Sequence, residues 1–115
     1  MGRAARLALL FAVAAAPASA HHGWSEYDSA KALKLTGKIL ESGYEHPHGH
    51  VVLETSDKKW NVVLAPPSRM EFRGLSKDML APGGTASVEG YPNRNKPDEM
   101  RAERITIQGK TTELR

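Results

Sequence analysis

His50-Val51-Val52-Leu53-Glu54-Thr55 and Lys59-Trp60-Asn61-Val62-Val63-Leu64 are the two stretches that decide the fold, because they flank a short polar connection. Both are rich in the β-branched and aromatic residues that strands favour. The intervening Ser56-Asp57-Lys58 has the length and polarity of a hairpin loop. The sequence therefore predicts two antiparallel strands in the middle of the chain.

Three further segments, 33–40, 86–91 and 104–108, have the short, bounded pattern of strands. Gly37 lies inside the first of them and indicates a bulge or a sharp bend. The segment 66–74 begins with proline and ends with glycine, which predicts a short helix of two turns or fewer. The expected order is three strands, a short helix and two more strands.

This order predicts an all-β protein, a small five-stranded OB-fold-like barrel with one short helix between the third and fourth strands. An up-and-down sheet and a small sandwich with the same number of strands are the alternatives. We expect the barrel domain at residues 33–109. An N-terminal arm at 21–32 carries Trp24 and Tyr27 and needs a surface to pack against, and residues 110–115 are expected to be a tail.

Residues 1–20 have the pattern of a signal peptide for secretion. Arg3 and Arg6 give a basic start, residues 7–15 are apolar, and Ala18-Ser19-Ala20 fits the small-residue cleavage signature. The apolar run is shorter than the about 20 residues that a transmembrane helix needs. We therefore expect cleavage after Ala20 and a periplasmic or secreted bacterial protein without a stable membrane span. An uncleaved anchor and cleavage after Ala18 are the alternatives.

The composition after cleavage excludes several classes of protein. Removing residues 1–20 leaves 95 of the 115 residues, enough for one small domain. Two of the 16 basic residues are lost, so 14 face 13 acidic ones, and this balance gives no general attraction to nucleic acid or acidic lipid. The chain has no cysteine, which excludes disulfides and thiolate metal sites. A metal would need imidazole, carboxylate, amine or thioether ligands.

All five histidines lie in two short groups, one directly after the expected cleavage site and one at 46–50 with the sequence HPHGH. Pro47 favours extended backbone, in which alternate residues project from one face. Imidazoles at alternate positions can converge on one metal ion, although Gly49 could tilt one of them away. The pattern predicts a metal site that draws on His21, His22, His46, His48 and His50.

After cleavage His21 would carry a free α-amine beside its imidazole. These two nitrogens and one imidazole from the second group would form a T-shaped set called a histidine brace, and planar nitrogen ligands favour Cu(II). Copper is therefore the expected cofactor, ahead of zinc or nickel, and His22 could take the place of His21. Glu26, Asp28 and Glu45 could add an axial oxygen or hold a ligating imidazole.

The sequence thus predicts an exported metal-binding protein that acts as a carrier or buffer, with a metal ion and another envelope protein as candidate partners. Catalysis is not favoured, because the chain has no cysteine and no Gly-x-Ser-x-Gly motif. The alternative is a non-enzymatic OB-type ligand or envelope-interaction module whose histidines form a solvated turn or a pH-responsive patch. In that case five aromatic residues could line its binding face or simply pack in the core: Trp24, Tyr27, Tyr44, Trp60 and Tyr91.

Several motifs resemble a family of small exported bacterial proteins of unknown function. They are Ala20-His21-His22-Gly23-Trp24 followed by Glu26-Tyr27-Asp28, then Pro47-His48, Lys77 to Gly83, and Val88-Glu89-Gly90. Trp24 stands where the family pattern has phenylalanine, and His46 stands where it has asparagine. The resemblance covers most of the mature chain. It implies an exported OB-like domain and supplies no activity.

Overall fold

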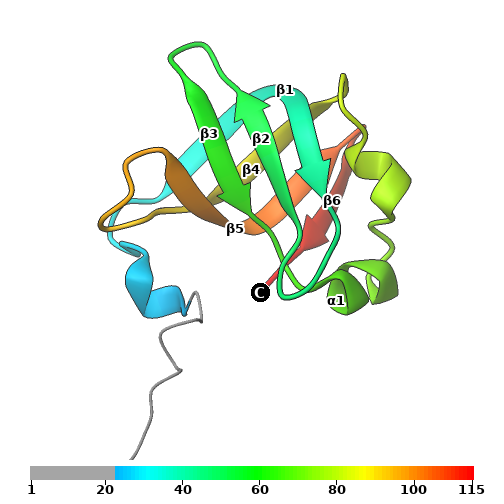
Figure 1. Cartoon of the computed structure of the whole chain (residues 1–115), viewed down its shortest axis with the longest axis horizontal. Coiled ribbons are helices and arrows are strands. Elements are labelled where there is room, and N and C mark those ends of the chain that lie inside the picture. Colours follow the sequence, from blue (N-terminus) through cyan, green and yellow to red (C-terminus); the bar gives the residue numbers. More distant parts are fainter. Residues whose placement is uncertain (1–22) are drawn as a thin grey trace, which may run out of the picture.

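The computed structural model describes residues 23–115, so the predictions that concern residues 1–22 lie outside it. This part of the chain forms six strands, one α-helix and two 3₁₀ turns (Figure 1). The strands are β1 (Leu33–Gly43), β2 (His50–Glu54), β3 (Lys59–Val63), β4 (Thr85–Pro92), β5 (Glu99–Ile107) and β6 (Lys110–Glu113). The helical elements are η2 (Trp24–Glu26), α1 (Pro67–Phe72) and η3 (Lys77–Leu80).

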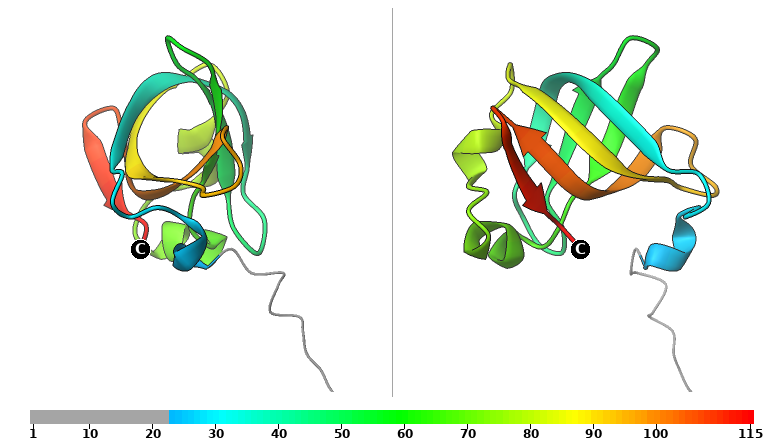
Figure 2. Two further views of the ribbon diagram at one scale, coloured as in Figure 1. Left: turned by 90° about the vertical axis from the view of Figure 1, so that its left-hand side faces the viewer. Right: turned by 180° about the vertical axis from the view of Figure 1, so that it is seen from behind.

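Strands β1 to β5 close into a barrel, which Figure 2 shows from its end. Antiparallel pairing joins β3 to β2, β2 to β1, β1 to β4 and β4 to β5. A parallel pairing of β3 with β5, from Asn61–Glu99 to Val63–Arg101, completes the ring. With α1 between β3 and β4, this is the predicted OB-fold-like barrel, and the fold prediction is confirmed.

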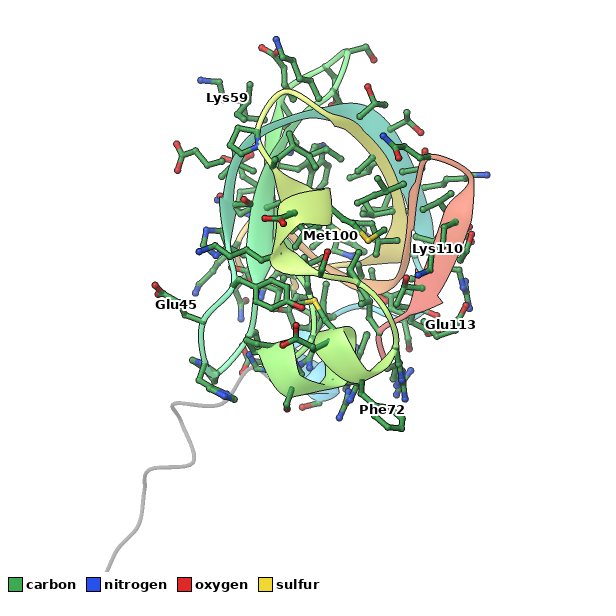
Figure 3. The ribbon with its side chains drawn as sticks, turned by 90° about the vertical axis from the view of Figure 1, so that its right-hand side faces the viewer. Glu45, Lys59, Phe72, Met100, Lys110 and Glu113 are labelled. Carbon is green, nitrogen blue, oxygen red and sulfur yellow. The ribbon has the colours of Figure 1, made fainter. Side chains whose placement is uncertain are left out.

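The barrel interior follows from the alternation of side chains along the strands. Val51 and Leu53 of β2 point inward and are buried, as are Trp60 and Val62 of β3, while the residues between them are more exposed. Met100 of β5 lies inside the ring of strands (Figure 3) and is 0% exposed. The predicted hairpin of 50–64 is therefore confirmed, with β2 and β3 paired on either side of its polar loop.

The long strand β1 pairs with β4 through its first half and with β2 through its second half. The β1–β2 register shifts between Ile39 and Glu41, so the irregularity lies at Leu40 and not at Gly37 as predicted. Gly37 serves another purpose, because a Cβ atom there would overlap the backbone carbonyl of Glu54. The glycine thus allows two strand backbones to approach each other closely.

The short helix α1 covers one end of the barrel (Figure 1), and its prediction is confirmed. Pro67 occupies the first turn, where its missing N–H is not needed. Met70 is the residue of α1 that faces the core, while Phe72 is 91% exposed. Gly74, with a φ of 86°, ends the helical segment in the left-handed region that glycine tolerates.

Two predicted boundaries near the C-terminus are wrong. Strand β5 begins at Glu99 and not at Arg104. Met100, Arg101 and Ala102 are all buried, so buried and exposed residues do not alternate in this part of the strand as the prediction from sequence assumes. Residues 110–113 of the expected tail form β6, which pairs with β5 after a tight turn at Gln108 and Gly109, both at positive φ. Leu114 follows β6 and is buried, which explains why this polar segment is held against the barrel.

Gly90 provides a test of the close approach of β4 to β5. A Cβ atom at Gly90 would overlap the backbone carbonyl of Arg101, which cannot move without breaking the β4–β5 pairing. We expect Gly90→Ala to lower the free energy of unfolding by about 3 kcal/mol in urea titrations. Gly84→Ala is the matched control, because its Cβ would lie at an ordinary 3.5 Å from the Ala81 carbonyl oxygen. Equal stability of the two variants would contradict this packing.

Candidate functional site

The loop between β1 and β2 carries the histidine segment to the end of the barrel that α1 also covers (Figure 1). His46 and Pro47 form an exposed bend with a cis peptide bond between them. Gly49 is buried and pairs with the chain after β3: its N–H donates to the Ala65 carbonyl at 2.9 Å. The segment is therefore bent at one end and fixed to the barrel at the other.

The described histidines occupy three different environments. His46 is exposed on the bend, His48 is half-buried, and His50 is exposed at the start of β2, opposite Val63. His48 and His50 border the same shallow pocket of about 150 Å³, together with Pro47, Gly49 and Val63. The loop thus brings two of its imidazoles to one pocket, and His46 is not among the residues that line it.

The expected convergence of His46, His48 and His50 does not occur in residues 23–115, where no three His, Cys, Asp or Glu side chains come together as a metal site requires. The reason is local. The alternation rule applies to a strand, and the strand begins only at His50, after the bend. His21 and His22 lie outside the described residues, so the complete set of five stays a prediction.

The side chain of His48 contacts Arg101, a residue that the sequence did not single out. Nη2 of Arg101 lies 3.4 Å from Nε2 of His48. A guanidinium has donors and no acceptor, so Nε2 must accept in this long hydrogen bond. This contact links the histidine loop to strand β5.

Arg101 itself is 6% exposed and lies on β5 at the point where this strand pairs with β3. Burial lowers the pKa of its guanidinium from the ordinary value, and the positive charges of Arg69 and Arg115 lower it further. A buried cation needs compensating contacts to remain charged. One such contact comes from the N-terminal arm.

Trp24 of η2 provides this contact. The indole ring lies with its centroid 4.4 Å from the guanidinium carbon of Arg101 and 4.3 Å from that of Arg115. Such distances are well within cation–π range. Edge-to-face contacts with Tyr27 and Tyr91, at centroid distances of 6.5 and 6.3 Å, hold the ring from other sides. The first described turn of the arm is thus linked to His48 through Arg101, at one end of the barrel (Figure 1, Figure 2).

Tyr27 attaches the arm to the barrel. The barrel is therefore the surface against which the arm packs, as the sequence requires. The residue is 1% exposed and its hydroxyl donates to Oε2 of Glu99 at 2.6 Å. Nδ2 of Asn93 donates to the same oxygen at 3.1 Å, and Tyr27 and Asn93 also form an isolated β-bridge. Burial, followed by the nearby carboxylate of Glu99, raises the pKa of the Tyr27 phenol well above its usual range.

The carboxylates predicted to support a metal are spread over the surface. Glu45 projects away from the barrel on the β1–β2 loop (Figure 3). Asp28 accepts a hydrogen bond from the N–H of Ala30 at 3.1 Å and so belongs to its own turn. Glu26 lies in η2, two residues after Trp24, and is half-buried. Glu26 is therefore the one of the three that the arm places beside the Trp24–Arg101 contact.

The five aromatic residues proposed as a binding face do not form one surface. Tyr27 and Trp60 are buried, and the hydroxyl of Tyr44 donates to the Leu75 carbonyl on the side of α1. Trp24 and Tyr91 contact each other at the end of the barrel with the arm. Packing explains most of these residues, as the simpler interpretation predicted.

None of the helices in residues 23–115 is long and apolar enough to cross a membrane.

Known proteins resemble this chain in family and in fold, and none of these similarities supplies an activity. The model of a family of unknown function, DUF6152, matches residues 9–101. No curated protein shows significant similarity to the chain. The chain is similar to the solved structure of a TiaS–tRNA–ATP complex, with a TM-score of 0.53 and 22% identity over 77% of this chain. It is also similar to the structure of the ZRD-deleted mutant of TiaS with agmatine, with a TM-score of 0.52 and 22% identity over 76% of this chain. It spans 20% and 25% of those chains, so the likeness concerns the fold alone.

Tyr27→Phe tests the attachment of the arm through its pH dependence. The phenol ionises near pH 10 in the unfolded chain and at a higher pH in the folded one, so the unfolded state loses its proton first. The stability that Tyr27 contributes is complete below pH 10 and falls as the pH rises further. We expect wild type to be about 1–3 kcal/mol more stable than the variant at pH 8.

Urea titrations at pH 8, 10 and 11 measure this difference. It should shrink by up to about 1.4 kcal/mol per pH unit above pH 10. A difference that stays constant from pH 8 to pH 11 would contradict the buried phenol.

Proposed function

Because this chain belongs to DUF6152, a family of unknown function, we propose its function from its own residues: an exported, periplasmic metal-binding protein that carries or buffers copper. In this proposal residues 1–20 are a signal peptide that is removed, and His21 becomes the first residue. Its α-amine and imidazole would chelate the metal together with an imidazole of the β1–β2 loop. The absence of cysteine makes nitrogen the main class of ligand.

The observation that supports this proposal is the contact chain from Trp24 through Arg101 to His48. Trp24 lies three residues after His21, and three residues of fully extended chain span at most about 11 Å. The length of the chain therefore limits the distance between the proposed first ligand and Trp24 to this value. Arg101 joins Trp24 to His48 of the HPHGH segment, and η2 lies at the same end of the barrel as the β1–β2 loop (Figure 2).

Two imidazoles of the loop are suitable as the third nitrogen. His50 is exposed and borders the pocket of about 150 Å³. His48 borders the same pocket, and its Nε2 would have to exchange the Arg101 hydrogen bond for the metal. His46 is exposed on the bend, and His22 could replace His21. Three nitrogens in a T-shaped set favour Cu(II) over zinc, which prefers tetrahedral ligands.

Copper titration of the processed protein tests the proposal. Mass spectrometry first establishes that the purified chain begins at His21, and not at Ser19 or further downstream. We expect one copper ion per chain. An Ala-Pro pair inserted ahead of His21 should weaken binding by at least about tenfold, because it moves the amine away from the His21 imidazole and the proline has no amide N–H through which a new planar chelate could form. Equal affinity of the two forms would remove the N-terminal amine from the site.

Single substitutions identify the third ligand. We expect His48→Ala or His50→Ala to weaken copper binding by at least about tenfold, while His46→Ala has a smaller effect, since His46 lies outside the shared pocket. Far-ultraviolet circular dichroism of each variant serves as the folding control. Unchanged affinity in all three variants would exclude the loop.

The alternative function is a non-enzymatic OB-type ligand or envelope-interaction module with incidental histidines. One observation favours it: residues 23–115 hold no ready group of three metal-ligating side chains. Binding of a partner that persists when His46, His48 and His50 are all changed to alanine would support this alternative.

A further inference from the structure

The indole of Trp24 contacts a second guanidinium besides that of Arg101. The guanidinium carbon of Arg115 lies 4.3 Å from the indole centroid. Nη1 of Arg115 is 3.4 Å from Oε2 of Glu103, and the hydroxyl of Tyr91 donates to the same carboxylate oxygen at 2.9 Å. An aromatic face and an oriented carboxylate thus surround one planar cation.

The groups around Arg115 are held in place by the barrel and the arm. Tyr91 lies on β4 and Glu103 on the neighbouring strand β5. Trp24 is held by edge contacts with Tyr27 and Tyr91 and by Arg101. These contacts do not involve Arg115, so its removal leaves the surrounding groups supported.

Arg115 is held more loosely than the groups that surround it. Its side chain is 55% exposed, while that of Glu103 is 18% exposed. The ion pair between them is long at 3.4 Å, and exposed pairs of this kind contribute little. Arg115 therefore resembles an exchangeable ligand in a preformed site.

We propose that Trp24, Tyr91 and Glu103 form a binding site for a guanidinium group, occupied in this structure by Arg115 and able to accept an arginine side chain of a partner in its place. A guanidinium stacks flat on an indole while its N–H groups reach a carboxylate. An ammonium group can also approach an indole face, but it has no plane to stack and no fork of donors to reach the carboxylate at the same time, so the site favours arginine over lysine. The site needs no metal, and its test uses no histidine variant, so it stands or fails separately from copper binding.

Nuclear magnetic resonance of the ¹⁵N-labelled full chain tests this site through the indole N–H of Trp24, which the variant Trp24→Phe assigns. The probe is N-acetyl-arginine methylamide, and methylammonium is the control cation. We expect Arg115→Ala to show a saturable shift of the Trp24 signal with a millimolar Kd, and wild type to bind at least about tenfold more weakly because its own arginine competes. Methylammonium should bind at least several-fold more weakly than the arginine probe.

Two further variants keep the result specific. Arg115→Ala combined with Glu103→Gln should bind the probe several-fold more weakly, since the carboxylate is lost. Arg104→Ala is the matched control, because Arg104 pairs with Glu89 and Glu113 and its removal leaves the indole covered. This variant should behave like wild type. Unchanged β6 backbone signals in Arg115→Ala verify that the fold is intact.

Each outcome of the titration bears on the site directly. No saturable shift in Arg115→Ala, or an equal shift with methylammonium, overturns the proposal. Binding of the arginine probe to the variant and not to wild type supports it. Methylguanidinium then distinguishes the source of the ligand: weaker binding than the arginine probe indicates an arginine residue in a polypeptide, and equal binding indicates a small free guanidino compound.

Discussion

The buried guanidinium of Arg101 is the constraint on which one end of this barrel depends. Its position on β5, where this strand pairs with β3, puts a cation at the point of barrel closure. A charge in such a place is unfavourable unless it finds partners, and here an indole and an imidazole are among them. The N-terminal arm, through Trp24, and the β1–β2 loop, through His48, thus contact the same side chain.

This arrangement separates the roles of the barrel and of its attachments. The strands provide a rigid frame whose interior is filled with apolar side chains. The chemically interesting groups lie on segments that leave the frame: the arm with Trp24, the loop with His48, and the residues after β6 with Arg115. Because Trp24 contacts both arginines, any ligand that moves the indole changes the surroundings of His48 as well. The two proposed sites are therefore neighbours, linked by the contacts of Arg101 with Trp24 and His48.

The sequence predicts most of the barrel, because local patterns determine it. The hairpin of 50–64 alternates clearly, and Pro67 and Gly74 bound the helix. The candidate site is less predictable, since Arg101 meets partners that are far away in the sequence and stands between two other buried residues of β5. The alternation argument does not apply to the histidine segment for a related reason: alternation holds within a strand, and only His50 of HPHGH belongs to one.

Strand β6, which the sequence did not predict, lies at the edge of the sheet. Within residues 23–115, β6 is the last strand in the sheet order, and Arg73 covers part of its outer edge by donating from Nη1 to the Glu113 carbonyl at 2.8 Å. A long, flat, apolar edge would recruit strands from other molecules and lead to fibrils. Here the edge is four residues long, KTTE, with a charge at either end, which makes it a poor template for such growth. An edge of this length and charge therefore offers few backbone groups for pairing with a strand of another molecule.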